Sequence, residues 1–382
     1  MQAPEHRPQI ENRKSKIENV FQGRRVLVTG HTGFKGAWLC AWLETLGAEV
    51  TGFALPPHTR PSLFEALGLA RRVRHIVGDI RDAGALTQAL KASRAEFVFH
   101  LAAQALVRVS YEDPKGTFDT NIGGTVNMLE ALRTYGKARV FIAVTSDKCY
   151  ENREWVWGYR ENDPLGGHDP YSASKGCAEL VFAAYARSFF TPGRVRKHGL
   201  GLASVRAGNV LGGGDWAAHR VVPDCIRALS RGKAPGIRNP GAVRPWQHVL
   251  EPLGGYLRLA AALAADPARF SGPWNFGPAA DNCRTVRAVA EAVVKAWGRG
   301  RWRDLSAGQQ PAAHEAQFLR LCCDKAAHLL GWKPVWGFDE TIRNTVDWYK
   351  AFYAARPGGS SCDRGAARRL CEEQIAAYGE EL

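Results

Sequence analysis

Apolar runs alternate with helical patterns along the first half of the chain. Runs of the kind that form buried parallel strands, bounded by polar or small residues, lie at 25–30, 48–55, 74–79, 96–101, 140–144 and 201–206. Helical patterns separate several of them, at residues 37–46, 117–135 and 175–190. This alternation predicts an α/β fold with a Rossmann-type, doubly wound parallel sheet.

The pattern is less regular in the second half of the chain. Residues 274–277 indicate the end of a strand, and helical patterns lie at 220–231, 251–263, 286–297, 324–330 and 338–354. We expect a smaller, mostly C-terminal α/β lobe that binds substrate. The predicted division is a flexible N-terminal tail (1–22), a dinucleotide-binding domain (23–205, with later contributions near 251–277), the substrate lobe (206–354) and a peripheral C-terminal tail (355–382).

A glycine-rich turn lies between the first predicted strand and the first predicted helix. Gly30, Gly33 and Gly36 have the spacing G-x-x-G-x-x-G within a βαβ unit. Glycines let the backbone turn tightly and approach a pyrophosphate, whose charge is met by N–H groups at the start of the helix. The sequence therefore predicts a dinucleotide cofactor at this turn.

The turn alone does not decide between NAD and NADP. The next strand ends at residues 51–55 without an acidic residue for the 2′-hydroxyl of the adenosine ribose, and Lys35, His58 and Arg60 lie nearby in the sequence. On the motif alone, NADP stays possible.

Five side chains that can handle protons lie within one stretch. Ser146, Asp147 and Lys148 follow the end of a predicted strand, and Tyr171 and Lys175 begin a helix, four residues apart on one face. A Ser-Asp pair can also be a simple turn or helix cap. Because ligands bind at the carboxyl ends of strands in open α/β sheets, we expect acid–base chemistry here.

The loop at residues 151–169 is polar and aromatic. Its length for a compact domain is typical of a lid or a binding segment, and the alternative is a packed surface loop.

Charge and cysteine content restrict the function further. The formal charge is +14, but Lys and Arg are spread along the 382 residues, which favours general surface charge and cations around an anionic substrate over a nucleic-acid face. The sequence has no apolar run of membrane-spanning length and no signal peptide in residues 1–22. Nine cysteines without C-x-x-C or zinc-like spacing predict reduced thiols, a cytoplasmic protein and no metal site.

The chain resembles extended short-chain dehydrogenase/reductases, specifically the nucleotide-sugar 4,6-dehydratases, from residue 25 to about residue 354. The motifs that carry the resemblance lie at residues 30–36, 145–150, 151–160, 206–210, 212–216 and 244–249. The pair Asp147-Lys148 is similar to the branch that acts on CDP-glucose, because the related dTDP-glucose dehydratases carry Asp-Glu there.

The resemblance implies an NAD-dependent hydro-lyase that converts CDP-glucose into CDP-4-keto-6-deoxyglucose and water, in deoxysugar and O-antigen-type lipopolysaccharide biosynthesis. NAD⁺ would take a hydride from C4, water would leave across C5 and C6, and the hydride would return to C6. It also implies a homodimer formed by the helices at 117–135 and 175–190, or a homotetramer, with no nucleic-acid or membrane partner.

The same resemblance suggests a role for each catalytic residue. Tyr171 would remove the proton of the C4 hydroxyl, Lys175 would lower the pKa of Tyr171 and hold the nicotinamide ribose, and Ser146 would bind the C4 oxygen. Asp147 would protonate the departing C6 hydroxyl, and Lys148 would remove the C5 proton. Alternatively, Lys148 only pairs with Asp147, which then performs both transfers.

The resemblance further implies two binding sets. The cofactor set is Gly30, His31, Thr32, Gly33, Phe34, Lys35, Gly36, Asp79, Ile80, Leu101, Ala102, Ala103, Gln104, Asn121, Thr145, Tyr171 and Lys175. The substrate set is Arg108, Asn209, Asp215, Trp216, Arg220, Arg244, His248 and Asn275. For Asn209, Arg244 and Asn275 a structural role is an equal alternative.

Other functions stay open at this point. A dehydratase for another nucleotide sugar would use the same residues, whereas a 4-epimerase would not need the acid–base pair Asp147-Lys148. A catalytically silent dinucleotide-binding regulator would not need Tyr171 and Lys175, and this chain has both.

Overall fold

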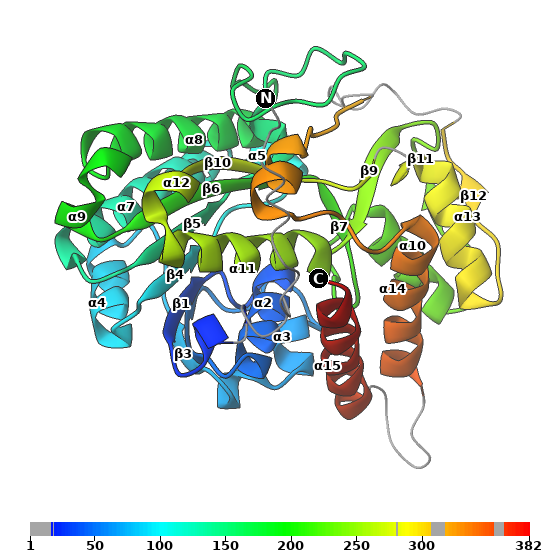
Figure 1. Ribbon diagram of the computed structural model, residues 1–382. Coiled ribbons are helices and arrows are strands. Elements are labelled where there is room, and N and C mark those ends of the chain that lie inside the picture. Colours follow the sequence, from blue (N-terminus) through cyan, green and yellow to red (C-terminus); the bar gives the residue numbers. More distant parts are fainter. Residues whose placement is uncertain (1–16, 18, 280–281, 307–317, 355–362) are drawn as a thin grey trace, which may run out of the picture.

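The computed structural model describes residues 17, 19–279, 282–306, 318–354 and 363–382 (Figure 1). Most of the predicted N-terminal tail lies outside these residues. The described part contains one large α/β lobe and, beside it, a smaller lobe built mainly from the second half of the chain (Figure 1).

The large lobe is organised around a seven-stranded sheet in the order β10-β6-β5-β4-β1-β2-β3. Every neighbouring pair in it is parallel, which confirms the predicted doubly wound sheet. The strands are β1 (Arg25–Thr29), β2 (Glu49–Ala54), β3 (Arg74–Val77), β4 (Phe97–His100), β5 (Val140–Val144), β6 (Gly201–Ala207) and β10 (Gly272–Phe276). The order reverses between β1 and β4, and such a switch point is where dinucleotides bind.

Helices cover both faces of this sheet because its strands are apolar on both sides. In β1, Val26 and Val28 join one buried cluster and Leu27 joins the other. The first cluster includes side chains of α2 (Phe34–Thr45) and α11 (Leu250–Ala265), and the second includes those of α4 (Ala83–Ser93), α7 (Gly124–Tyr135) and α8 (Pro170–Ser188). Short helices join them: α3 (Leu63–Ala66), α5 (Val107–Glu112), α6 (Pro114–Phe118), α9 (Val195–His198) and α12 (Pro267–Phe270).

Two predicted helices differ from the structure at their starts. The helix expected at 117–135 is divided, because a π-helical turn at Asp119–Gly123 separates α6 from α7. Helix α8 begins at Pro170, before the expected start, because the Asp169 side chain caps it by accepting the Ser172 N–H and proline suits the first helical position.

The smaller lobe lies beside the carboxyl ends of the large sheet's strands (Figure 1). It contains the three-stranded sheet β11-β9-β7 and the pair β12-β8. Their bounds are β7 (Asn209–Leu211), β8 (Gly236–Ile237), β9 (Val243–His248), β11 (Cys283–Thr285) and β12 (Arg303–Asp304), with helices α10 (Val221–Ser230), α13 (Val286–Trp297) and α14 (Phe338–Tyr353). A further π-helical turn covers Ala326–Leu330.

The C-terminal segment differs from the peripheral tail that we expected. Helix α15 (Arg364–Glu381) buries Ala367, Cys371, Ile375 and Tyr378 in the same cluster as α2 and α11. A Gly- and Ser-rich segment precedes this helix, and such a segment is typical of a chain end that does not pack on the core. The sequence therefore predicts a tail and does not reveal the apolar face of the helix. Residues 355–362 of that predicted tail lie outside the described residues.

A fully buried carboxylate fastens α15 to the core. Glu251 accepts hydrogen bonds from the N–H groups of Val335 and Trp336 and from the Tyr378 hydroxyl. Burial raises the pKa of Glu251 to about 7, against these hydrogen bonds, which lower it. The folded protein therefore holds a proton on Glu251 at a pH where the unfolded chain has lost it.

We expect this carboxylate to make folding stability depend on pH. Because the folded pKa is raised from 4.5 to about 7, the unfolding free energy should fall as pH rises through that window, by about 3 kcal/mol in total. Glu251→Gln should remove this fall, and Glu373→Gln, at an exposed position of α15, should keep it. Urea unfolding between pH 4.5 and 7 checks this, and an unchanged slope in Glu251→Gln would contradict it.

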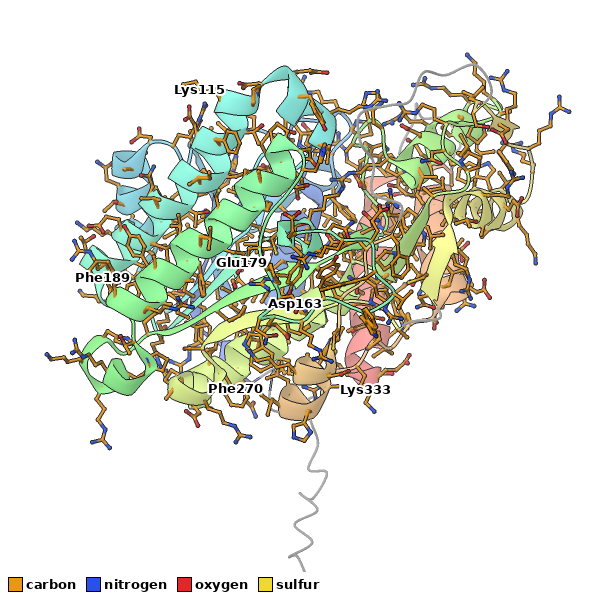
Figure 2. The ribbon with its side chains drawn as sticks, turned by 90° about the horizontal axis from the view of Figure 1, so that it is seen from above. Lys115, Asp163, Glu179, Phe189, Phe270 and Lys333 are labelled. Carbon is orange, nitrogen blue, oxygen red and sulfur yellow. The ribbon has the colours of Figure 1, made fainter. Side chains whose placement is uncertain are left out.

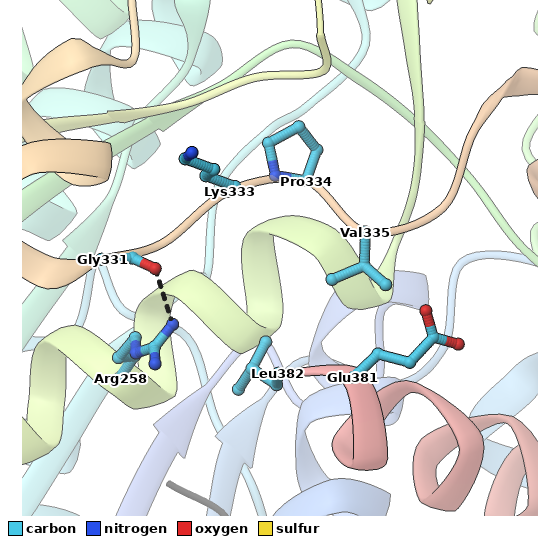
Figure 3. Close-up of a pocket in the computed structure, with 7 residues that line it drawn as sticks. All are labelled: Arg258, Gly331, Lys333, Pro334, Val335, Glu381 and Leu382. Atoms are coloured by element: carbon cyan, nitrogen blue, oxygen red, sulfur yellow. Dashed lines mark hydrogen bonds between the residues drawn. The ribbon is translucent and has the colours of Figure 1, made fainter. Parts of the chain in front are cut away.

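A pocket of about 470 Å³ lies near this junction (Figure 3). It is lined by Arg258, Gly331, Lys333, Pro334, Val335, Glu381 and Leu382. The Arg258 side chain donates a hydrogen bond to the Gly331 carbonyl across it. None of the predicted site residues lines this pocket.

Within the described ranges, no helix has both the length and the apolar character that crossing a bilayer requires. The eight cysteines in those ranges are free thiols.

Candidate functional site

The glycine-rich turn has the shape that a dinucleotide needs. Gly30 has φ +76°, and a Cβ there would stand 2.7 Å from the Ala102 nitrogen; a Cβ on Gly36 would stand 2.2 Å from the Gly30 oxygen. Gly33 precedes α2 as its N-cap and offers no side chain to the first N–H groups of the helix. These N–H groups stay available to an anion, so the turn fits a pyrophosphate.

Two side chains of the predicted cofactor set hold the turn itself. His31 is buried, and its Nε2 forms a hydrogen bond of 2.7 Å with Nδ1 of His75. Burial, and then the charge of His75, lower the pKa of His31 to about 4, so it is neutral at physiological pH. The Thr32 hydroxyl donates to the Leu55 carbonyl at 2.8 Å. Both side chains thus fasten the turn to β2 and β3 and are not free for a ligand.

Phe34 and Lys35 lie in the first turn of α2 and face the small lobe. The Phe34 ring packs against Gly212, where a Cβ would be 3.1 Å from it. The Lys35 amine lies 5.9 Å from the centre of the Tyr256 ring. Burial, then the charges of Arg220 and Lys175, lower the pKa of Lys35 to about 8. Lys35 therefore belongs to a group of cations that also contains Lys175.

The loop after β4 closes the other side of the turn. Leu101, Ala102, Ala103 and Gln104 are half-buried there. Asn121 fixes this loop, because its amide donates to the Gln104 carbonyl and its oxygen accepts the Gln104 N–H. The same amide also donates to the Ser174 hydroxyl at 2.8 Å, which connects the loop to α8. Asn121 thus positions the loop after β4 and helix α8, and these contacts occupy its side chain.

Asp79 and Ile80 follow β3 at the far side of the predicted cofactor site. The Asp79 carboxylate accepts a bidentate contact from Arg81, whose hydrogen bonds lower its pKa. Ile80 is buried against Gly124 of α7, where a Cβ would be 2.4 Å from it.

The structure brings the catalytic side chains from β5 and α8 together. Ser146 and Asp147 are 7% exposed and Tyr171 is 8% exposed. The Ser146 hydroxyl donates to Asp147 Oδ1 at 2.9 Å, and it lies near enough to the Tyr171 hydroxyl to lower the pKa of Tyr171. A carbonyl or hydroxyl oxygen of a substrate that lies beside Ser146 would therefore also lie beside Tyr171.

Burial governs the protonation of this group. It raises the pKa of Asp147, although Lys148, Ser146 and Arg244 lower it, and a carboxyl with a raised pKa can act as a proton donor. It also raises the pKa of Tyr171 to about 12, against the Ser146 hydrogen bond and the Arg220 charge.

The pKa of Tyr171 differs from the value expected beside Lys175. We expected its charge to lower the pKa of Tyr171, but burial dominates and the pKa of Tyr171 is raised. Lys175 is itself buried, and this lowers its pKa to about 8, against the charges of Cys149 and Glu179. An amine with a pKa of about 8 is still mostly charged at neutral pH.

Lys148 is half-buried beside this group. Among the described residues, no ion pair within 4.0 Å joins it to Asp147, although its charge lowers the pKa of that carboxyl. The Lys148 amine is therefore not held in the direct ion pair with Asp147 that the alternative role of Lys148 requires.

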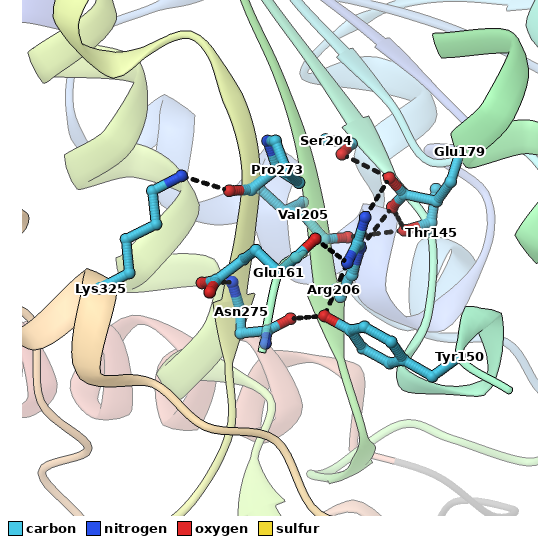
Figure 4. A network of polar contacts seen from close by, with 10 residues as sticks. All are labelled: Thr145, Tyr150, Glu161, Glu179, Ser204, Val205, Arg206, Pro273, Asn275 and Lys325. Carbon is cyan, nitrogen blue, oxygen red and sulfur yellow. Dashed lines mark hydrogen bonds and ion pairs between the residues drawn. The ribbon is translucent and has the colours of Figure 1, made fainter. Parts of the chain in front are cut away.

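Thr145 was predicted to bind the cofactor, and its hydroxyl is instead used within the fold. It donates to Glu179 of α8 at 2.5 Å. The Glu179 carboxylate forms a buried ion pair with Arg206 of β6 (Figure 4). Sequence reasoning missed Glu179 and Arg206, although the spacing of Glu179 from Lys175 places both on one helix face.

Five residues of the predicted substrate set are Arg108, Asn209, Asp215, Arg220 and Arg244, and of these Arg220 and Arg244 lie near the catalytic side chains. Arg220 pairs with Asp215 at 2.8 Å, and its charge lowers the pKa of Tyr171. Asn209 and Arg244 are half-buried on the neighbouring strands β7 and β9, and Arg244 lowers the pKa of Asp147. Arg108, on α5, is exposed. These positions suit an anionic substrate.

Three other residues of that set are core residues. His248 is fully buried, and burial lowers its pKa to about 3. Trp216 packs against Tyr349, and its ring nitrogen donates to Tyr353. Asn275 is fully buried, accepts the Tyr150 hydroxyl and donates to the carbonyls at 159 and 322. Their side chains cannot contact a substrate in this structure. The sequence prediction failed here because a motif does not reveal whether a side chain points into the core.

The loop at residues 151–169 is packed at its base. Isolated β-bridges join Tyr150 to Leu165 and Tyr159 to Leu321. Both tyrosines belong to a small buried cluster. Val156 and Trp157 at its outer part are 72% and 68% exposed. This is what the alternative of a packed surface loop predicts.

The site contains no cluster of metal ligands. Across the described ranges, no group of three or more His, Cys, Asp or Glu side chains is arranged to hold an ion.

Comparisons with known proteins agree with this arrangement. The model of the NAD dependent epimerase/dehydratase family matches residues 26–296. The chain is 51% identical to the CDP-glucose 4,6-dehydratase of Salmonella typhimurium, over 88% of this chain and 93% of that protein. It is 31% identical to a dTDP-glucose 4,6-dehydratase of Streptomyces antibioticus, over 73% of this chain and 76% of that protein.

Solved structures show the same fold. The UDP-glucose 4-epimerase of Thermus thermophilus, in complex with NAD, superposes with a TM-score of 0.71 at 28% identity, over 85% of this chain and 99% of that chain. A dTDP-glucose 4,6-dehydratase of Bacillus anthracis, also with NAD, has a TM-score of 0.70 at 20% identity, over 86% of this chain and 97% of that chain.

Proposed function

Because the chain belongs to the NAD dependent epimerase/dehydratase family, we propose that it is a CDP-glucose 4,6-dehydratase. It would convert CDP-glucose into CDP-4-keto-6-deoxyglucose and water. The observation that carries this proposal is the identity of 51% to a CDP-glucose 4,6-dehydratase over 88% of the chain. The grouping of Ser146, Asp147, Lys148 and Tyr171 supplies the chemistry that such a reaction needs.

NAD, when bound, supplies the reversible hydride acceptor for oxidation at C4. The turn with Gly30, Gly33 and Gly36 would hold its pyrophosphate, and Lys175 would hold the nicotinamide ribose. This fit rests on the uncapped N-terminus of α2 and on the close backbone packing of the turn.

The proton transfers of the reaction fall to residues around the sugar. Tyr171 would accept the proton of the C4 hydroxyl, while Ser146, which lies near Tyr171 and lowers its pKa, would hold the C4 oxygen. Lys148 would remove the C5 proton, which becomes acidic once C4 is a ketone, and a proton would return to C5 when the hydride returns to C6. Asp147 would give its proton to the departing C6 hydroxyl, and its burial, which raises the pKa, favours the protonated form that this transfer needs.

The test is turnover of CDP-, dTDP-, UDP- and GDP-glucose by the purified protein with NAD. The proposal predicts a 4-keto sugar from CDP-glucose, visible as an alkali-induced chromophore, and a higher kcat/KM for CDP-glucose than for the other three. Faster turnover of another nucleotide sugar would favour a different dehydratase of the same family.

We also propose that the protein forms a homodimer through α7 and α8, or a homotetramer made of two such dimers. Leu180 of α8 and Phe189, the residue that follows the helix, are 58% and 52% exposed, and Figure 2 shows Phe189 at the edge of the molecule while Glu179 points inward. Covering these apolar side chains with a second copy would remove them from water. Sedimentation equilibrium should give two or four chain masses, whereas one chain mass would refute the dimer.

We infer that the protein works in the cytoplasm and supplies deoxysugars for surface polysaccharides. The free thiols in the described ranges fit a reducing compartment. Recovery of the protein in an oxidising compartment after cell fractionation would contradict this.

A further inference from the structure

Helix α8 carries a buried acid that the proposed proton transfers do not use. Tyr171, Lys175 and Glu179 follow each other at intervals of four residues, so they share one face of the helix. Glu179 is 2% exposed and points into the molecule (Figure 2). Burial would raise its pKa, but the charge of Arg206 and hydrogen bonds from Arg206, Thr145 and Ser204 hold the pKa below the ordinary value. Glu179 is therefore a permanent negative charge in the interior.

The partners of this charge lie at both ends of the catalytic segment. At one end, the hydroxyl of Thr145, the residue before Ser146, donates to Glu179 Oε1 at 2.5 Å. Arg206 binds both carboxylate oxygens of Glu179, through Nε at 2.9 Å and a terminal nitrogen at 2.8 Å. At the other end, Arg206 donates to the Tyr150 hydroxyl at 2.6 Å (Figure 4).

We propose that Glu179 and Arg206 are a positioning pair that clamps segment 145–150 at both ends. The clamp holds Ser146, Asp147 and Lys148 against the face of α8 that carries Tyr171 and Lys175. This inference rests on the proposed function, because it assigns the pair to the geometry of that same reaction.

The surroundings of the Glu179–Arg206 pair suit a role in positioning the catalytic segment better than a role in stabilising the fold. Removing two charges from water costs several kcal/mol per ion, and buried pairs can often be replaced by apolar side chains without loss of stability. Here each charge is saturated by oriented partners: Thr145 and Ser204 donate to Glu179, and Arg206 also donates to the carbonyl of Glu161. Such a network fixes one geometry, which matters most where reacting atoms must be aligned within about 1 Å.

Thr145 and Ser204 provide a matched pair of variants. Each donates one hydroxyl to Glu179, at 2.5 Å and 2.8 Å, but only Thr145 belongs to the clamped segment. Thr145→Val should lower kcat about 100-fold with KM for CDP-glucose changed about twofold at most, as expected for misplacement by about 1 Å. Ser204→Ala should keep the wild-type kcat, and Thr145→Ser should restore it. Steady-state kinetics, NAD affinity and melting temperature are measured for all three.

Three results would overturn the clamp. Thr145→Val could keep the wild-type kcat and only lower the melting temperature, which would make the pair merely structural. Thr145→Ser could fail to restore kcat. Thr145→Val could lose NAD affinity at unchanged kcat, which would make Thr145 a cofactor-binding residue as first predicted.

A measurement without substrate separates this inference from the proposed function. If the wild type does not turn over CDP-glucose, the proposed function fails, but amide hydrogen exchange still tests the clamp. Exchange in segment 145–150 should be faster in Thr145→Val than in Ser204→Ala and the wild type. Equal exchange in the two variants would refute the clamp.

Discussion

Lys148→Ala should stop the reaction after oxidation at C4, so that reduced nicotinamide accumulates while CDP-glucose is bound. Without the amine nothing removes the C5 proton, and dehydration should slow by about 10²- to 10⁴-fold, the usual contribution of a general base. The half-buried Lys148 has no ion pair with Asp147 among the described residues, so its loss should leave the fold intact. Absorbance of reduced nicotinamide in a stopped-flow experiment, together with product formation, checks both parts.

Lys148→Arg is the matched control for charge. It keeps a cation that lowers the pKa of Asp147 but is a poor base at neutral pH. It should therefore accumulate reduced nicotinamide like the alanine variant. Wild-type dehydration by Lys148→Ala would show that Lys148 is not the base and that Asp147 performs both transfers.

Tyr171→Phe should block the step before, so that neither product nor reduced nicotinamide appears. The variant removes only the hydroxyl that lies near Ser146, and turnover should fall by about 10²- to 10⁴-fold. Burial raises the pKa of Tyr171 to about 12, and only the phenolate can accept the C4 proton, so the wild-type oxidation rate should rise with pH through the neutral range. The phenylalanine variant should lose that rise.

The contrast between the two variants decides between classes of function. Reduced nicotinamide in Lys148→Ala but not in Tyr171→Phe places the two residues at successive steps. A Tyr171→Phe variant that turns over like the wild type would instead favour a catalytically silent dinucleotide-binding protein.

The parallel sheet and the catalytic group could be predicted because local patterns encode them. Val140–Val144 is apolar throughout, and its end delivers Ser146 and Asp147, while the spacing of Tyr171 and Lys175 places both on one helix face. These features depend on neighbours in the sequence and on a rule for where strands of α/β sheets bind ligands.

The remaining errors concern contacts between distant segments. His248 lies in a motif that resembles a binding site, but its side chain is buried in the core, which depends on the packing of other elements. Asn275 is also buried, as the alternative of a structural role predicts. The pKa of Tyr171 depends on burial more than on Lys175, and burial cannot be read from spacing. Helix α15 packs on α2, far away in the sequence, so its buried face was not recognised.

The most direct test of the central claim is the reaction with CDP-glucose in deuterated water, followed by mass spectrometry of the sugar nucleotide. If C5 loses its proton to Lys148 and water leaves from C6, the product should lack one water and carry one solvent deuterium, at C5. A product with the mass of the substrate would indicate epimerisation. A product that has lost water without gaining deuterium would contradict removal of the C5 proton by a base that exchanges with solvent.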